Sequence, residues 1–142
     1  MLTTKCPCGT GETYQSCCEK YITQEKKPTT PLQLMRSRYT AFSENFMLYI
    51  QTTCGGKALE SFNAQDTSKA NSPNTLSIIW TQLEILNYDE TPEKNKPSFV
   101  EFKAHYSIQG QSNVLHEKSE FRWSNQKEMW LYVDGEIIES ML

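Results

Sequence analysis

The sequence has no long hydrophobic run and no excess of basic residues. No apolar stretch approaches the ~20 residues that a membrane-spanning helix needs. The first twelve residues, MLTTKCPCGTGE, lack the apolar segment of a secretory signal peptide. The net charge of −3 and the pI of about 5.4 disfavour a protein that coats nucleic acid. We therefore expect a cytoplasmic protein with no membrane partner and no bulk binding of nucleic acid.

Internal repeats and low-complexity tracts are also absent. The chain has 142 residues and a mass of 16.4 kDa, which corresponds to about one domain of ordinary size. Its mean hydropathy of −0.62 is low, but 11% of the residues are aromatic. That content of large apolar side chains predicts a folded core rather than a disordered chain.

Cysteine is almost absent after residue 18. Four of the five cysteines, Cys6, Cys8, Cys17 and Cys18, lie in the stretch CPCGTGETYQSCC, and only Cys54 follows it. A disulfide-stabilised secreted domain would spread its cysteines along the chain, and no CxxC redox pair is present. Four thiolates about 2.3 Å from one ion form a closed tetrahedral Zn²⁺ site. The spacing therefore predicts one structural zinc ion, and four free thiols in a flexible tail are the weaker alternative.

This cysteine segment is too short to bury a core of its own. Gly9 and Gly11 permit the positive φ angles of a tight reversal between the two cysteine pairs. Metal binding would then supply most of the folding energy of about 20 residues. We divide the chain into an N-terminal knuckle (residues 1–22), a polar linker (23–30) and a larger domain (31–142).

The pattern CxCGxGxxYxxCC resembles the SEC-C zinc motif, which occurs at the C-terminus of the SecA translocase and in several small bacterial proteins. Two later stretches, LMRSRYTAF at 34–42 and LHEKSEF at 115–121, resemble the uncharacterised YchJ family. That family joins an N-terminal SEC-C motif to a domain of nuclear-transport-factor-2-like (cystatin-like) fold. The resemblance covers nearly the whole chain, and it implies a cone of helices packed on a bent antiparallel sheet.

The resemblance also implies a role for the knuckle in protein interaction. The equivalent motif of SecA contacts the secretion chaperone SecB, and ribosome contact is attributed to similar tails. Many SEC-C motifs carry lysines inside the knuckle, whereas this one has Glu12 to Ser16 without a lysine. Lys5, Lys20, Lys26 and Lys27 form only a thin basic cluster among glutamates, which disfavours nucleic acid as the partner.

The order of secondary structure predicted from the sequence is helices first and strands second. Thr30 and Pro31 have the residue types of an N-cap and a first helical position. Apolar residues at steps of three and four then predict an amphipathic helix that faces a core: Leu32, Met35, Tyr39 and Phe42. Two further helices are expected near 46–54 and 57–70.

Antiparallel strands are expected over the second half of the chain. Residues 75–88 are rich in Ile, Leu, Trp and Tyr, and residues 100–108 alternate cleanly between apolar and polar side chains. The remaining predicted strands are 114–124, 128–133 and 136–139, separated by a hairpin loop at 109–113 and by turns at 124–127 and Asp134–Gly135. This pattern is typical of an α+β domain.

Glu117 is the candidate polar residue inside the predicted cone. It shares a strand face with Leu115 and Phe121, and a carboxylate in such surroundings needs a partner. Helix geometry predicts an ion pair with Arg36 or, failing that, Arg38. We favour a structural role for this pair, which ties helix to sheet, over a catalytic one.

The two histidines have a solvent-facing position in the predicted strands. His105 falls on the polar face of 100–108, and His116 falls on the polar face of 114–124. A bulge that turned His116 inward would place it beside Glu117 as an acid–base pair.

Two classes of function are compatible with these observations. The first is a protein-interaction module whose knuckle docks on a secretion chaperone or the ribosome. The second is a small-molecule binder or an enzyme that uses the cone around Glu117 and Arg36, with His116 as a further candidate. The sequence contains no convincing Asp–His or Tyr–Asp constellation, so we assign no catalytic residue. It also does not define an oligomeric state.

Overall fold

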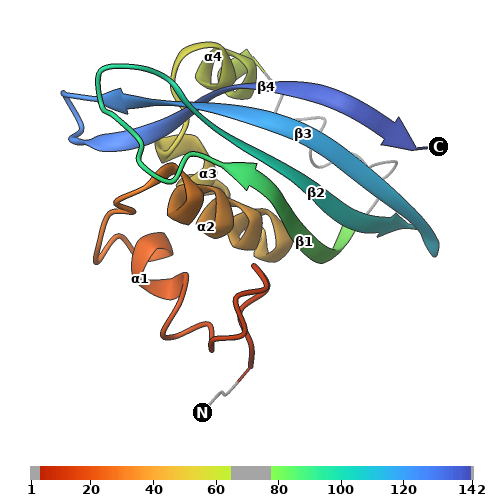
Figure 1. Cartoon of the computed structure of the whole chain (residues 1–142). Helices are drawn as coiled ribbons and strands as arrows, with labels where there is room; N and C mark the ends of the chain where they lie inside the picture. Colours follow the sequence, from red (N-terminus) through yellow and green to blue (C-terminus); the bar gives the residue numbers. More distant parts are fainter. Residues whose placement is uncertain (1–3, 65–77, 142) are drawn as a thin grey trace.

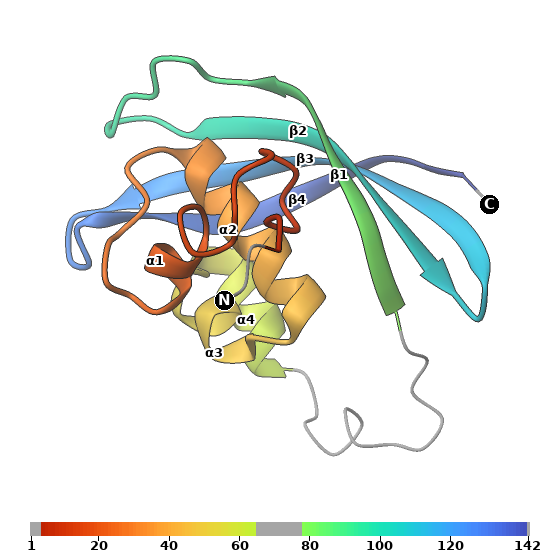
Figure 2. The same ribbon diagram turned by 90° about the horizontal axis from the view of Figure 1, so that it is seen from below.

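In the residues that the computed structural model describes, 4–64 and 78–141, four helices precede four strands (Figure 1). The strands form one antiparallel sheet in the order β1-β2-β3-β4. The helices gather on one face of this bent sheet (Figure 2). The elements are α1 (Glu19–Ile22), α2 (Pro31–Glu44), α3 (Met47–Thr52), α4 (Gly56–Ala64), β1 (Ile78–Tyr88), β2 (Ser98–Ile108), β3 (Gln111–Ser124) and β4 (Met129–Met141). This architecture confirms the predicted α+β class.

Helix α2 begins where the sequence predicts. The Thr30 side chain accepts a hydrogen bond from the backbone N–H of Gln33 at 3.2 Å, and Pro31 occupies the first turn. The helix ends at Glu44 and is followed by Asn45, whose φ of 64° is the left-handed conformation common after a helix C-terminus. It therefore runs two residues beyond Phe42, the last apolar residue of the predicted stripe.

Helix α2 is buried on more than one side. It lies between the sheet on one side and the N-terminal knuckle on the other (Figure 1). Its buried positions therefore include residues outside the predicted stripe, such as Leu34, Ser37, Arg38 and Thr40, in addition to Met35 and Tyr39 of the stripe. Phe42, which we expected in the core, is instead 40% exposed near the end of the helix.

The inner faces of β2 and β3 follow the predicted alternation. Val100, Phe102 and Ala104 of β2 are buried, as are Ser119 and Phe121 of β3. Antiparallel pairing places Phe102 opposite Glu117 and Val100 opposite Ser119. The faces assigned to these two strands from the sequence are therefore correct, and they bring Glu117 to the helix-covered side.

Strand β4 corrects the prediction of two short strands and an Asp134–Gly135 turn. It is one continuous strand whose pairing with β3 passes through Gly135, which lies opposite Ser119. Asp-Gly is a common turn dipeptide, but here the chain continues through two bulges, with Val133 and Ile138 as the extra residues. The hairpin between β2 and β3 is also shorter than predicted, with Gln109 and Gly110 both at positive φ.

Two predicted elements extend into residues 65–77, which lie outside the described residues. These are the end of the helix expected at 57–70 and the start of the strand expected at 75–88. The observed α4 ends at Ala64, and β1 begins at Ile78. In the described part of the chain, no helix combines the length and the apolar character needed to cross a membrane.

Phe121 is the position in β3 where truncation should be most damaging. Its side chain is fully buried, and its ring lies 5.8 Å from that of Tyr132 in an edge-on arrangement. Phe121→Ala should lower the free energy of unfolding by about 3–5 kcal/mol, because it removes packed surface and leaves a void. Urea titration measures this loss. Ile79→Ala is the control, because Ile79 is 63% exposed, and equal losses for the two variants would contradict the core assignment.

Candidate metal centre and cavity

The N-terminal knuckle reverses direction tightly between its two cysteine pairs. The backbone N–H of Cys6 donates to the carbonyl oxygen of Glu12 at 2.8 Å. Gly9 and Gly11 have φ angles of 87° and 92°, which favour glycine because it has no side chain. Cys18 then directly precedes α1. These turns return the chain so that the second pair of cysteines faces the first.

The four predicted ligands, Cys6, Cys8, Cys17 and Cys18, come together in the structure. Their sulfur atoms all lie within 4.8 Å of one another. The Sγ atoms of Cys8 and Cys17 are 3.5 Å apart, and those of Cys17 and Cys18 are 3.9 Å apart. Four sulfurs about 2.3 Å from a tetrahedral ion would be about 3.8 Å apart. The cluster therefore fits one metal ion with no open coordination position.

The thiols differ in their readiness to ionise. A hydrogen bond with Cys18 lowers the pKa of Cys6, whereas burial raises the pKa of Cys17 to about 12. A metal ion binds the thiolate forms and must displace the remaining protons. Metal affinity should therefore fall as the pH falls.

Helix α2 supports the cysteine cluster through two side chains spaced four residues apart. The Arg36 Nη1 donates to the carbonyl oxygen of Cys8 at 2.7 Å. The Thr40 hydroxyl donates to the Sγ of Cys18 at 3.4 Å and also lies 3.6 Å from the Sγ of Cys6. Groups that hydrogen-bond to ligands orient them and tune metal binding. Sequence reasoning missed this role of Thr40, although a polar residue in an apolar helix is a possible signal.

Thr40→Val tests this support with a nearly isosteric change. The variant keeps the volume of the side chain but loses the hydrogen bond to Cys18. We expect metal affinity to fall by about 10–100-fold, as measured by competition with a chromogenic chelator. Thr52→Val makes the same chemical change on α3, and an equal effect there would contradict the specific role of Thr40.

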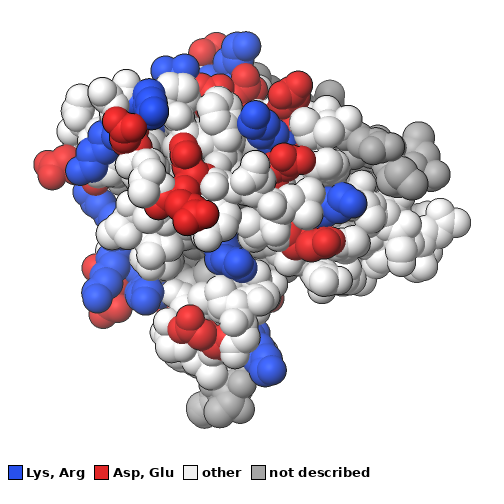
Figure 3. Space-filling view, viewed as in Figure 1, with Lys and Arg blue, Asp and Glu red and all other residues white. Residues whose placement is uncertain are grey.

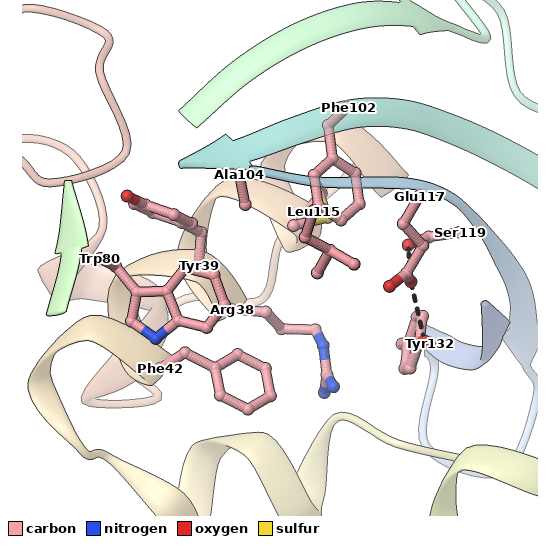
Figure 4. A pocket seen from close by; sticks show the side chains of 11 residues that line it. Arg38, Tyr39, Phe42, Trp80, Phe102, Ala104, Leu115, Glu117, Ser119 and Tyr132 are labelled. Carbon is pink, nitrogen blue, oxygen red and sulfur yellow. Dashed lines mark hydrogen bonds between the residues drawn. The ribbon is translucent and has the colours of Figure 1, made fainter. Parts of the chain in front are cut away.

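A cavity of about 240 Å³ lies between α2 and the sheet (Figure 4). Its walls are mainly apolar and come from α2 and from all four strands of the sheet. The apolar lining includes Met35, Tyr39, Trp80, Phe102 and Leu115, and the polar lining is Arg38, Glu117, Ser119 and Tyr132.

Glu117 points into this cavity, as predicted, but its partners are neutral hydroxyl groups. Its Oε2 accepts hydrogen bonds from Ser119 at 2.8 Å and from Tyr132 at 3.0 Å. Burial and the neighbouring Glu117 both raise the pKa of Tyr132, so its hydroxyl stays protonated and donates. The contribution of Tyr132 could not be foreseen, because it depends on the pairing of β3 with β4.

The predicted ion pair between Glu117 and an arginine is wrong for the described residues. Arg36 points the other way, toward the knuckle. Arg38 lines the cavity, but its Nη1 donates to the carbonyl of Ile50 at 3.0 Å and to the hydroxyl of Thr53 at 2.6 Å. The prediction failed because it assumed one apolar stripe on α2, whereas α2 is covered on two sides.

Gly135 gives Glu117 and Tyr132 the room they need. A Cβ atom at Gly135 would overlap Glu117 Oε2 and the Tyr132 hydroxyl. The reason for glycine is therefore space in a paired strand, and not the turn expected from the sequence.

Gly135→Ala should therefore disturb this end of the cavity. We expect a loss of about 1–3 kcal/mol in the free energy of unfolding, because the added methyl group displaces a hydrogen-bonded pair. Denaturant titration gives the value. In a background with Glu117→Ala and Tyr132→Phe the overlap is gone, so the cost should drop. An unchanged cost in that background would contradict the steric explanation.

Both histidines lie on the outer face of the sheet. The Nε2 of His116 is 2.7 Å from Glu101 Oε2, and the Nε2 of His105 is 3.0 Å from Glu84 Oε1. A bulge does occur beside His116, but its extra residue, Ile138, is in β4. His116 therefore keeps its outward position and does not join Glu117 in the cavity.

Both the N-terminal knuckle and the larger domain match families of known proteins. A family model described as the YchJ middle NTF2-like domain matches residues 30–135, and a SEC-C motif model matches residues 3–20. The chain belongs to the YchJ family. A YchJ relative in Vibrio parahaemolyticus, named as a UPF0225 protein, is 34% identical over 94% of this chain and 75% of its own length. A UPF0225 protein of Cupriavidus pinatubonensis is 32% identical over 95% of this chain and 90% of its own length.

Solved structures agree with the fold described for this YchJ family member. A SEC-C motif containing protein from Rhodopseudomonas palustris superposes with a TM-score of 0.75 at 28% identity, covering 94% of this chain and 98% of that protein. A second one, from Psychrobacter arcticus, gives a TM-score of 0.72 at 25% identity and covers 100% of this chain and 88% of that protein. The predicted nuclear-transport-factor-2-like fold and the SEC-C assignment are confirmed.

Proposed function

We propose that this protein is a zinc-dependent protein-interaction module in which the N-terminal knuckle and the neighbouring corner of the helices form a docking surface. Zinc is the metal that four thiolates in a closed tetrahedral site favour. Such a site is structural, because it leaves no position for a substrate or water. Thiolate ligands persist in a reducing compartment, which is consistent with the cytoplasm.

The observation that carries the proposal is an exposed apolar patch beside the knuckle. Phe46, Met47 and Leu48 follow one another at the start of α3, and each is substantially exposed, Leu48 by 68%. A groove of about 150 Å³ next to them is formed by the knuckle, by Glu44 and by Phe46. Contiguous apolar exposure of this kind often marks a protein-binding surface.

The charge distribution favours a protein partner over nucleic acid. On the face seen in Figure 3, Lys and Arg side chains are interspersed with Asp and Glu side chains. Lys27 and Lys127 are also engaged, since their Nζ atoms donate to the carbonyl oxygens of Lys127 and Thr52. By resemblance to other SEC-C proteins, the partners to test are a secretion chaperone of the SecB type and the ribosome.

Cys17→Ser tests the metal half of the proposal. The variant should lose its zinc and the protection of the knuckle amides from hydrogen exchange, because one of four ligands is gone. The amides of β2 and β3 should stay protected, because each of these strands is paired with a neighbour on both sides within the sheet. Native mass spectrometry measures the metal content, and hydrogen-exchange mass spectrometry measures the protection of the amides.

Cys54→Ala is the matched control for this experiment. Cys54 is buried away from the cluster, and its thiol donates to the carbonyl oxygen of Ile50 at 3.0 Å. The Cys54→Ala variant should therefore keep one zinc per chain. Loss of zinc in the control, or retention in Cys17→Ser, would show that the metal is not held by the four clustered cysteines.

Leu48→Ser tests the docking half. Cosedimentation with purified ribosomes and size-exclusion analysis with purified SecB should show binding by the unmodified protein. Binding should weaken at least about tenfold in Leu48→Ser, because a central apolar contact is lost. Ile79→Ser is the control, since Ile79 is equally exposed but lies on β1. Absence of binding to both partners, or equal weakening by the control, would refute the proposed surface.

A further inference from the structure

The cavity between α2 and the sheet has apolar walls and one polar end. Its volume of about 240 Å³ is just below the range of about 300–1,000 Å³ that drug-sized ligands occupy. Trp80, Phe102 and Leu115 contribute to the walls, whereas Arg38 and Glu117 bring opposite charges to the polar end (Figure 4). A matching ligand is small, mainly apolar and polar at one end.

Arg38 is a buried cation whose charge has no carboxylate partner in the described residues. Its side chain is 4% exposed, and the ion pairs of the described residues do not include it. All its hydrogen bonds to described residues come from Nη1. Because no fully buried polar atom in the described residues lacks a partner, the other terminal nitrogen keeps accessible surface. Arg38 lines this cavity and also a neighbouring hollow toward α3 and α4. A buried charge without a counter-ion is costly, so an anionic group beside Arg38 would be favourable.

Glu117 offers the complementary group. Its Oε2 receives both protein hydrogen bonds, from Ser119 and Tyr132, while Oε1 receives none from the described residues. By the same argument, Oε1 keeps accessible surface, and Glu117 lines the cavity. A hydrogen-bond donor on a ligand could bond to this oxygen, which accepts no hydrogen bond from the described residues.

Tyr132 separates the two charges and so sets the geometry of the polar end. The Arg38 Cζ lies 4.6 Å from the centre of the Tyr132 ring, and the Tyr132 hydroxyl donates to Glu117 at 3.0 Å. Arg38 therefore lies over the ring face and Glu117 lies at the hydroxyl edge. A ligand that satisfies both must carry an anion and a hydrogen-bond donor close together.

We propose that this cavity binds a small carboxylic acid that has a hydrogen-bond donor on the carbon next to the carboxylate and an apolar side group. This is the chemistry of apolar α-amino acids and α-hydroxy acids. The carboxylate lies against the Arg38 guanidinium, the ammonium or hydroxyl donates to Glu117, and the side group packs among Trp80, Phe102 and Leu115.

Other ligand classes leave part of the polar end unsatisfied. A purely apolar ligand would displace water from Arg38 and Glu117 without replacing its hydrogen bonds. A phosphate monoester would bring two negative charges to a site with one arginine and an opposing carboxylate. An amine alone would satisfy Glu117 but place a second cation near Arg38.

Four probes with the same phenyl body test the ligand class on the full-length protein: phenylalanine, phenyllactate, hydrocinnamate and phenethylamine. The first two carry both groups, hydrocinnamate lacks the donor and phenethylamine lacks the carboxylate. Titrations followed by amide chemical shifts in NMR should give at least tenfold tighter binding for phenylalanine or phenyllactate than for the other two. Tighter binding of phenylalanine would show that the ligand group that donates to Glu117 is an ammonium, and tighter binding of phenyllactate would show that it is a hydroxyl. Equal binding of hydrocinnamate, or no binding of any probe up to about 10 mM, would overturn the proposal.

Two variants locate the binding in the cavity. Glu117→Gln keeps the shape but removes the charge, so the Kd of the preferred probe should rise about tenfold while that of hydrocinnamate stays the same. Ala104→Leu fills the cavity and should abolish binding, whereas Ser107→Leu adds the same side chain on the outer face of β2 and should not. If Ala104→Leu does not fold, the Kd of the preferred probe for Glu117→Gln is the test. Unchanged binding in Glu117→Gln would refute the assignment.

Discussion

The burial of α2 between two different structures is the constraint on which the rest of the protein depends. On one side, Arg36 and Thr40 contact the backbone and sulfur atoms of the cysteine cluster. On the other side, Met35 and Tyr39 face the sheet and line the cavity. Helix α3 covers a further side of α2, where the polar residue Ser37 is fully buried and hydrogen-bonded to the hydroxyl of Tyr49 at 2.7 Å.

This arrangement gives two arginines, two residues apart, entirely different roles. Arg36 donates to the Cys8 carbonyl and so joins the metal centre to α2, whereas Arg38 faces the cavity and stacks on Tyr132. Side chains at positions i and i+2 of a helix point in nearly opposite directions. The metal centre and the cavity therefore share one helix, and a change in one region can reach the other through α2. Metal loss should affect the cavity side less than the knuckle itself, because the sheet supplies most of the cavity wall.

The sequence was most informative where local chemistry decides the structure. The four clustered cysteines could be assigned to one site because few other arrangements suit their spacing. The N-cap at Thr30 and the inward face of β3, including Glu117, followed from rules that act over a few residues. All of these features are present in the structure.

Features that depend on the packing of distant segments were not predictable in the same way. To place Arg36 correctly, one must know which side of α2 faces the sheet. The side that carries Arg36 packs against the knuckle instead. Gly135 was interpreted as a turn residue because Asp-Gly is common in turns, but its role is to leave space for Glu117 and Tyr132. Tyr132 lies opposite Phe121, and its contact with Glu117, four residues earlier in β3, depends on how β3 pairs with β4. Alternation within one strand does not give this pairing.

The most direct test of the central claim is X-ray absorption at the zinc edge, with metal analysis, on protein purified without added metal or chelator. The account predicts one zinc per chain with four sulfur ligands at about 2.3 Å. Protein without zinc, or zinc bound by nitrogen or oxygen in place of the four cysteines, would contradict it.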